Sequence, residues 1–420
     1  MKSRLKLFFG TLFMVSLIAV FTVGLRGQGS LPTRNIEAEG AVIALEVLRP
    51  ACDLAGQIEE AKLLLKNSAP LKISETPKRA ILRKEISLVI LDTQTCSITE
   101  SRYLLDEADV KKANALRRAY QDNPGNLPKF MPVDPKNEFS VTVNWWNNHN
   151  SDLSIVKDGS VEEDRYIVIA NKFAISNDSL AYNEDKTGPR YSDIIYVPYS
   201  SGIHADALIE LGKKFLNEKV DSAFDELARQ SVQSAAYPSK LVTDVIRKEF
   251  PKNLFITEQT DPALIFASSD NGKRLAERVF IRLGANGDKT FRYTYSKTGA
   301  LGLGQIMPGT YGSIVKRYPA AKLLRDIDIG RVDVENGIKA TILVLDDHFA
   351  TVVKNANGSS KGRTILAGKT HSEIEEIMAA AYNGGPGKYK PLTGTISLAV
   401  RETVDFVRKF KMIRDLKLFD

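Results

Sequence analysis

Residues 296–308 read S-K-T-G-A-L-G-L-G-Q-I-M-P, and residues 379–387 read A-A-A-Y-N-G-G-P-G. The glycines of the first segment let a backbone approach another molecule closely, and the amide of Gln305 offers both a donor and an acceptor. The second segment contains Asn-Gly-Gly-Pro, which is typical of the end of a helix. Either segment alone is a weak signal, but their occurrence together predicts a functional site in this part of the chain.

Together the two segments resemble the motifs of the lytic transglycosylase family of the lysozyme superfamily, S-x-x-G-A-x-G-L-x-Q-x-M-P followed by A-x-Y-N-x-G-P-G. The matching positions are Ser296, Gly299, Ala300, Gly302, Leu303, Gln305, Met307, Pro308, Tyr382, Asn383, Gly385, Pro386 and Gly387. We extend the resemblance to residues 236–392. It implies a lysozyme-like domain that cleaves peptidoglycan between N-acetylmuramic acid and N-acetylglucosamine and leaves a 1,6-anhydro product.

Breaking a glycosidic bond requires a carboxylic acid that protonates the leaving oxygen, and an apolar environment raises the pKa of such an acid. The resemblance implies one glutamate that acts first as acid and then as base, with no second carboxylate, metal or cofactor. In the family this glutamate opens an E-S-x-F-N-P motif about a dozen residues before Gly-Ala. That offset falls at Gly287 in this chain, so the acid must be sought elsewhere upstream.

Glu258 is the candidate that we favour for the acid. It follows an amphipathic stretch, its neighbours Phe255 and Ile256 supply an apolar wall, and the Asp-Pro dipeptide just after it resembles the family's Asn-Pro. This assignment requires an insertion over residues 263–294. The insertion contains R-V-F-I-R-L-G and F-R-Y-T-Y, and we expect two strands around a turn there.

Glu277 is the alternative acid. It needs a shorter insertion, but the adjacent Arg278 and the strand-like V-F-I-R-L that follows predict an exposed residue at the entrance of a strand. For either glutamate, an ordinary solvated side chain is the competing interpretation, because acids are rarely buried without a reason.

The resemblance also implies substrate-binding roles for Ser296, Gly302, Gln305, Met307, Tyr382 and Asn383. Structural alternatives stay open for several of them. Serine often closes a turn or caps a helix, a buried amide can tie two helices together, and Asn-Gly-Gly can simply end a helix.

The composition is that of a globular protein with more than one domain. Of 420 residues, 43% are hydrophobic, and 58 Lys and Arg against 51 Asp and Glu give a net charge of +7. This charge favours an anionic wall polymer or a lipid surface, while the absence of zinc-finger spacing and RNP-like motifs argues against nucleic acid. The sequence Asp346-Asp347-His348 predicts no metal site, because adjacent helical residues point in different directions.

The N-terminus predicts the compartment. Three basic residues within the first six positions precede an uncharged apolar run at residues 7–25, which is long enough to cross a bilayer as a helix. Its exit lacks an Ala-x-Ala site, so we expect residues 1–26 to be an uncleaved membrane anchor, with the body of the chain in the periplasm or wall space. Secretion after signal cleavage is the alternative. An oxidising exterior would allow Cys52 and Cys96 to form a disulfide, although two separate thiols fit the sequence equally well.

Composition and periodicity divide the rest of the chain into four regions. We expect a helical region at 36–121, a β-rich region at 135–200, a helical connector at 201–235 and the lysozyme-like domain at 236–415. Within that domain we expect one helix at 239–250, with Pro238 in its first turn, and a last helix at 396–411. The fold class is therefore α+β and mainly helical, with a small β-element in the C-terminal domain. Trp145 and Trp146 in the β-rich region either stack on sugar rings or are ordinary strand residues.

These features predict a membrane-anchored murein lytic transglycosylase whose partners are peptidoglycan glycan strands and the cytoplasmic membrane. Two alternatives stay open: a hydrolytic lysozyme on the same scaffold, which would release reducing ends, and a catalytically inactive wall-binding or assembly protein. The position of Glu258 relative to Gln305 and Tyr382 discriminates among them.

Overall fold

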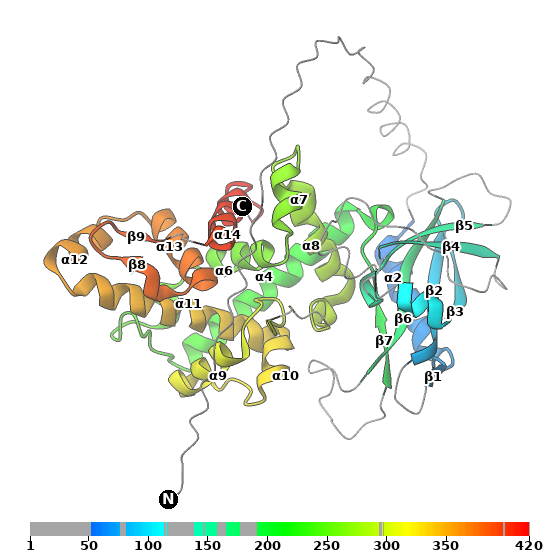
Figure 1. The fold of residues 1–420 in the computed structure, drawn as a ribbon, viewed down its shortest axis with the longest axis horizontal. Coiled ribbons are helices and arrows are strands. Elements are labelled where there is room, and N and C mark those ends of the chain that lie inside the picture. Colours follow the sequence, from blue (N-terminus) through cyan, green and yellow to red (C-terminus); the bar gives the residue numbers. More distant parts are fainter. Residues whose placement is uncertain are drawn as a thin grey trace, which may run out of the picture. The chain divides into compact units, whose positions relative to one another are not determined.

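The computed structural model describes residues 52–75, 81–112, 115, 138–145, 148–157, 165–176, 191–293, 296, 298–397 and 400–419. Strands predominate in the N-terminal part of these ranges and helices in the C-terminal part, which confirms the α+β, mainly helical class (Figure 1). Within these ranges, no helix has the length and hydropathy needed to span a bilayer. The expected anchor at residues 1–26 lies outside the described residues.

The N-terminal part is built from one antiparallel sheet, a hairpin and a helix. The sheet has the order β1-β2-β6-β7, and β3 also pairs with β2, while β4 and β5 form the hairpin. The elements are α2 (Leu54–Asn67), β1 (Ile73–Glu75), β2 (Ile81–Asp92), β3 (Ser97–Leu105), β4 (Phe139–Trp145), β5 (Asp152–Lys157), β6 (Tyr166–Ser176) and β7 (Tyr191–Tyr196). Helix α2 packs on β2, β3, β6 and β7. The side chains of Trp145 and Trp146 lie outside the described residues.

The expected helical region at 36–121 is wrong over β1, β2 and β3. Strand β2 explains why, because its apolar residues alternate between two faces with the period of a strand. Ile86, Leu88 and Ile90 pack in the core that includes the β4–β5 hairpin, whereas Val89 and Leu91 pack in the core that includes α2. Both faces of β2 are therefore buried. The charged residues at its ends do not change this strand pattern into a helical one.

The two cysteines, whose pairing the sequence left open, form a disulfide. Their Cα atoms are 5.5 Å apart. Cys52 lies just before α2 and Cys96 in the turn between β2 and β3, so the bridge fastens the start of the helix to the sheet.

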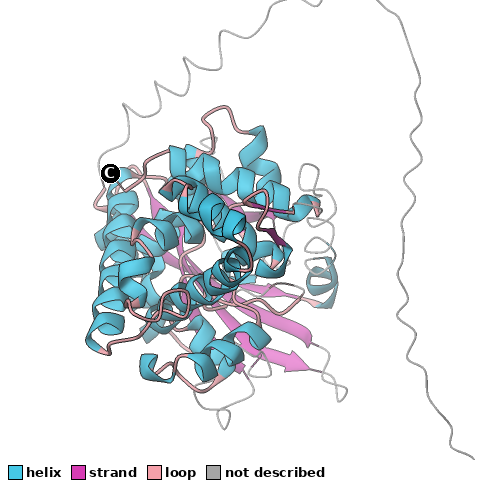
Figure 2. Cartoon of the chain, turned by 90° about the vertical axis from the view of Figure 1, so that its left-hand side faces the viewer, coloured by secondary structure: helices cyan, strands magenta, loops and turns pink. Residues whose placement is uncertain are grey.

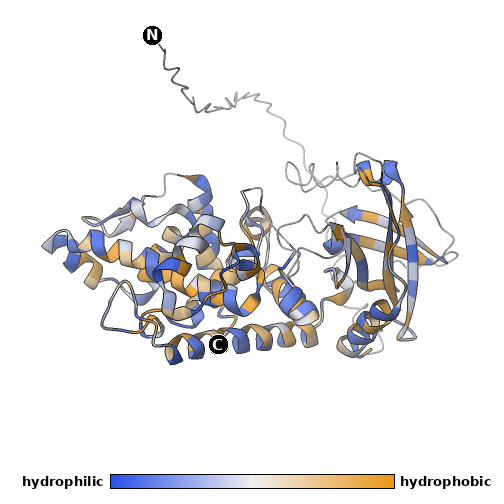
Figure 3. Ribbon diagram, turned by 90° about the horizontal axis from the view of Figure 1, so that it is seen from below, coloured by the Kyte–Doolittle hydropathy of each residue, from blue (hydrophilic) through white to orange (hydrophobic). Residues whose placement is uncertain are grey.

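The C-terminal part is helical, and Figure 2 shows its helices crossing one another in several directions. The elements are α4 (Asp206–Arg229), α5 (Val242–Val245), α6 (Glu249–Glu258), α7 (Pro262–Ala267), α8 (Lys273–Asn286), α9 (Pro308–Arg317), α10 (Ile327–Val332), α11 (Val334–Asn357), α12 (Ser360–Ala367), α13 (His371–Gly384), β8 (Tyr389–Lys390), β9 (Thr395–Ile396) and α14 (Arg401–Asp415). Short 3-10 turns lie at Asn148–Asn150, Ser201–Ile203, Gly287–Lys289, Pro319–Ala321 and Pro386–Lys388. Hydrophilic and hydrophobic residues alternate along the helices, as Figure 3 shows, and most of α11 is buried.

The expected pair of strands at 263–294 is wrong, because α7 and α8 occupy most of this insertion. The apolar side chains of α8 recur with helical spacing and face α4. Two glycines allow an especially close approach of the two backbones. A Cβ at Gly212 would lie 1.9 Å from the carbonyl oxygen of Phe280, and one at Gly284 would lie 2.4 Å from that of Leu208. This tertiary contact favours a helix over a strand.

Two helix boundaries also differ from the expectation. The helix expected at 239–250 is replaced by the short α5 and by α6, whose first residue is Glu249. The last helix covers Arg401–Asp415 rather than 396–411. Thr395 and Ile396 are unavailable to it because they pair with β8.

Candidate active site

Glu258 is the last residue of α6, a helix whose residues from Phe250 to Thr257 are all buried. Glu258 as a whole residue is partly exposed, but its carboxyl is buried. Burial raises the pKa of Glu258 to about 7, the nearby cation of Lys409 opposes this rise, and Glu402 reinforces it. A substantial share of this carboxyl is therefore protonated near neutral pH, as a general acid requires.

The glycine-rich segment forms a tight loop next to the end of α6. Leu301 and Ile306 pair as an isolated β-bridge across the loop. Arg331, itself 2% exposed, donates from Nη1 to the carbonyl oxygens of Gly299, at 2.6 Å, and Ile306, at 2.9 Å. Gly302 has a φ of +74°, and a Cβ there would lie 1.9 Å from the carbonyl oxygen of Arg331. Glycine at this position therefore lets the loop lie directly against the end of α10.

Gln259, the residue after Glu258, ties α6 to this loop. Its Nε2 donates to the carbonyl oxygen of Leu303 at 2.8 Å and to that of Gly302 at 3.3 Å. Gln259 belongs to neither sequence motif. Its adjacency to the candidate acid was the available signal.

Tyr382, on α13, binds the same loop from the other side. Its hydroxyl donates to the carbonyl oxygen of Gly304 at 2.5 Å. Burial raises the pKa of Tyr382, and the nearby Glu258 carboxylate raises it further, while a hydrogen bond with Thr341 opposes the rise. A Cβ at Gly304 would lie 2.3 Å from Oγ1 of Thr341 and 3.3 Å from the Tyr382 hydroxyl oxygen. Both sequence motifs and Glu258 thus meet at one place.

The other residues expected on the substrate side have described contacts of their own. Ser296 closes a turn, since its Oγ accepts from the N–H of Ala300 at 2.9 Å. Gln305 has a φ of +49°, and its Nε2 donates to the carbonyl oxygen of Gly302 at 2.8 Å. Met307 precedes α9 with 39% of its surface exposed. Asn383 follows Tyr382 in α13. Their roles in substrate binding stay predictions.

Glu277 lies in a different environment from the one that the sequence predicted. It is in the middle of α8 and not at the entrance of a strand, and its side chain is 19% exposed. Nε2 of His204 lies 3.1 Å from its carboxylate, and Nζ of Lys273 lies 3.8 Å from it. The other ring nitrogen of His204 is 2.9 Å from the Tyr199 hydroxyl. This carboxylate is therefore part of a polar network between α8 and the segment before α4.

Asp346 and Asp347 of the Asp346-Asp347-His348 sequence bind other parts of the protein, and the ring centroid of His348 lies 6.4 Å from that of Tyr382. The Asp346 carboxylate accepts from the backbone N–H of Ala235 at 2.6 Å and from the hydroxyls of Tyr318 and Ser234. Asp347 pairs with Arg317 at 2.7 Å. Among the described residues, no group of three or more His, Cys, Asp and Glu side chains is arranged to hold a metal ion.

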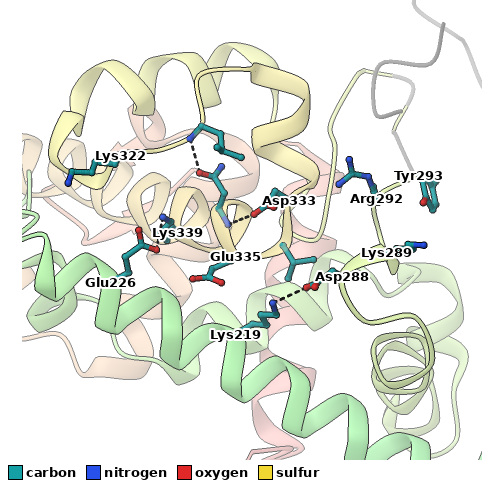
Figure 4. Close-up of a pocket in the computed structure, with 13 residues that line it drawn as sticks. Lys219, Glu226, Asp288, Lys289, Arg292, Tyr293, Lys322, Asp333, Glu335 and Lys339 are labelled. Atoms are coloured by element: carbon teal, nitrogen blue, oxygen red, sulfur yellow. Dashed lines mark hydrogen bonds and ion pairs between the residues drawn. The ribbon is translucent and has the colours of Figure 1, made fainter. Parts of the chain in front are cut away.

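A pocket of about 740 Å³ lies elsewhere on the helical part, between α4 and the start of α11 (Figure 4). Neither Glu258 nor Tyr382 lines it. Opposite charges in it pair with one another, Lys219 with Asp288 at 3.0 Å and Lys339 with Glu226 at 2.8 Å. Glu226 and Asp288 are therefore held in ion pairs, and neither of them belongs to the two sequence motifs.

Comparison with known proteins identifies a domain within the helical region. The family model described as Transglycosylase SLT domain matches residues 290–393, which include the glycine-rich loop and Tyr382. No curated protein and no solved structure matches the chain. The matched range begins after Glu258, which comes to the site through the contacts of α6. A domain of this kind implies a glycan-cleaving transglycosylase whose substrate is peptidoglycan.

Proposed function

We propose that this chain, whose C-terminal part contains an SLT-type, lysozyme-like domain, is a peptidoglycan lytic transglycosylase with Glu258 as its single general acid and base. It would cleave the bond between N-acetylmuramic acid and N-acetylglucosamine. One observation carries the proposal. Glu258, with its pKa raised to about 7, ends a helix that Gln259 ties to the loop of the first motif, and Tyr382 of the second motif binds that loop too.

The proposed reaction uses one carboxyl twice. Protonated Glu258 first donates its proton to the glycosidic oxygen, and the bond from that oxygen to C1 of the muramic acid breaks. The carboxylate then removes the proton from the C6 hydroxyl of the same sugar, and the C6 oxygen bonds to C1. The products are a 1,6-anhydro sugar and a free hydroxyl on the leaving sugar, and no water is consumed. Glu258 ends the cycle protonated.

We place the protein at the cell membrane, held by residues 1–26, with its body in the periplasm or wall space. The apolar run at residues 7–25 and the position of peptidoglycan outside the membrane support this proposal. The Cys52–Cys96 disulfide supports it as well, because disulfides persist mainly in oxidising compartments. Secretion after signal cleavage is the alternative outcome, and the mass of the mature chain distinguishes the two.

The test is mass spectrometry of purified peptidoglycan digested with the full-length protein and with Glu258→Gln. Release of anhydro-muropeptides by the wild type, with loss in the variant, supports the reaction and the acid together. Release of reducing ends instead identifies a hydrolytic lysozyme. Wild-type protein that pellets with the wall but releases nothing would falsify the enzyme proposal and indicate a wall-binding protein.

A further inference from the structure

We propose that Arg282 and Lys409 are positioning residues that clamp the C-terminal end of α6 from two sides and thereby fix the carboxyl of Glu258. This inference rests on the proposed function. Neither residue lies within the range that matches the SLT model, because Arg282 is on α8 and Lys409 is on α14. The clamp therefore joins two segments outside that range to the acid.

The end of a helix leaves carbonyl oxygens without partners in the helix itself. At the end of α6 the carbonyl oxygens of the two residues after Glu258 each accept a hydrogen bond from a cationic side chain. Nη2 of Arg282 donates to that of Gln259 at 3.2 Å, and Nζ of Lys409 donates to that of Thr260 at 2.6 Å. Cations are also favoured at this end of a helix by its dipole.

Both cations are held in place by their surroundings. Lys409 is only 5% exposed, and α14 packs on α6 and α7. The Arg282 guanidinium carbon lies 4.9 Å from the centroid of the Phe291 ring, and its Nε is buried without a hydrogen-bond partner. Burying charged groups is costly unless they are paired. The presence of both buried cations at the end of α6 supports a role in placing the backbone beside the acid.

The two cations differ in how they act on the carboxyl. The charge of Lys409 acts directly on Glu258 and lowers the pKa of its carboxyl, while burial lowers the pKa of Lys409 itself. The other groups that act on these two charges are Glu402 on α14, Tyr382 on α13 and Asp261 just after α6. Arg282 is not among the groups that shift the pKa of Glu258. Lys409 therefore sets both position and pKa, and Arg282 sets position.

A second buried lysine of the same chain, Lys172, also binds carbonyl oxygens at the end of a helix, far from Glu258 in the sequence, and its Nζ lies 3.7 Å from the carboxylate of Asp193. Nζ of Lys172, which is 4% exposed, donates to the carbonyl oxygens of Leu65 and Ser68 at 3.0 Å and of Ala69 at 3.2 Å, at the end of α2. Lys172 thus caps a helix in the β-rich part. It provides a control in which a buried lysine binds the end of a helix that does not carry Glu258.

The experiment measures kcat, KM, the pH dependence of kcat and Tm for full-length variants acting on peptidoglycan. Lys409→Met and Arg282→Met are expected to lower kcat by about tenfold or more, with KM changed less than about twofold. Lys409→Arg is expected to restore most of the rate. In Lys409→Met the loss of activity toward high pH should move to higher pH, because a cation that favours the carboxylate is gone. In Arg282→Met the loss of activity toward high pH is expected at the same pH as in the wild type.

Three variants serve as controls. Lys411→Met removes a lysine with a 47% exposed side chain on α14, and Arg274→Met removes an exposed arginine on α8. Both are expected to match the wild type. Lys172→Met is expected to lower Tm without moving the pH dependence. All assays are run well below the Tm of each variant. A variant that is only less stable is then still folded, and its kcat can be compared with that of the wild type.

The outcomes separate this inference from the proposed function. If the wild type releases no anhydro product, the proposed function fails, and ¹³C NMR titration of the Glu258 carboxyl in Lys409→Met still tests the clamp, with an upward shift expected. If the wild type is active and both Met variants keep its kcat and pH dependence, the clamp is wrong. A loss of kcat that Lys172→Met shares equally at the same fraction folded also overturns it.

Discussion

Two glutamates in neighbouring helices, Glu258 at the end of α6 and Glu277 in the middle of α8, have opposite surroundings. The Glu258 carboxyl is buried enough to raise its pKa to about 7, and the cation nearest to it, Lys409, is bound to a backbone carbonyl. The Glu277 carboxyl lies within 3.1 Å of His204 and 3.8 Å of Lys273. Glu277 therefore lies in a network of polar partners, whereas burial dominates at Glu258 and the charge of Lys409 opposes it. The difference shows that partners, more than position in the sequence, mark the candidate acid.

The largest expected effect tests the comparison of Glu258 with Glu277 directly. Glu258→Gln is expected to lower the rate of glycan cleavage by about 10²–10⁴-fold, since an amide cannot transfer the proton. Glu277→Gln is expected to change it by less than about threefold, because the loss of a polar contact away from the site costs little. The measurement is the rate of muropeptide release by both variants under identical conditions. A larger loss from Glu277→Gln would transfer the acid to α8.

The second effect concerns the loop that adjoins Glu258 and has no counterpart at Glu277. Gly304→Ala is expected to lower kcat by about 10–100-fold, because the added methyl group collides with Thr341 and displaces the loop from Tyr382. The matched control is Gly309→Ala in the first turn of α9, where a Cβ meets no atom within 4 Å. That variant is expected to keep wild-type activity. Equal activity of the two variants would show that the loop does not position the acid.

The third effect isolates the hydroxyl of Tyr382. Tyr382→Phe leaves the carbonyl oxygen of Gly304 without this donor and is expected to lower kcat by about tenfold, which corresponds to the usual cost of an orphaned buried acceptor. Activity assays at fixed pH, with Tm measured in parallel, check this. The comparison is sharpened by combining Tyr382→Phe with Glu277→Gln. We expect the double variant to behave like Tyr382→Phe alone, because the two residues belong to separate networks.

The site's local features could be predicted from the sequence because they reside in short segments. The turn of residues 296–308 needs glycine at positions 299 and 302, where φ is +89° and +74°, and this requirement is visible in the sequence. Glu258 was chosen as the candidate acid from its apolar neighbours, which the structure shows to be buried, and its role stays a prediction. The end of the second motif likewise follows from Gly385, whose φ is +87°.

The remaining features depend on contacts between distant parts of the chain. V-F-I-R-L in α8 fits a strand as well as a helix, and the close approach of Gly284 to α4 decides between them. The region of β2 was expected to be helical, and the burial of this strand on two faces becomes visible only in the sheet. Lys409 reaches a carbonyl oxygen 149 residues away, which no local pattern encodes.

The smallest expected effect is on stability, and its sign distinguishes the two glutamates. The folded state raises the pKa of Glu258 above its unfolded value, so this group stabilises the fold below about pH 4.5, and that contribution is lost as pH rises through about 7. Glu258→Gln removes the buried charge. The free energy of unfolding of Glu258→Gln is therefore expected to equal that of the wild type near pH 5 and to exceed it at pH 8 by on the order of 1–3 kcal/mol. Glu277→Gln removes contacts with His204 and Lys273 and is expected to be less stable than the wild type, by under about 1 kcal/mol. Denaturant unfolding of the three proteins at both pH values provides the measurement. A Glu258→Gln variant less stable than the wild type at pH 8 would show that the carboxylate is well accommodated there, which a proton donor must not be.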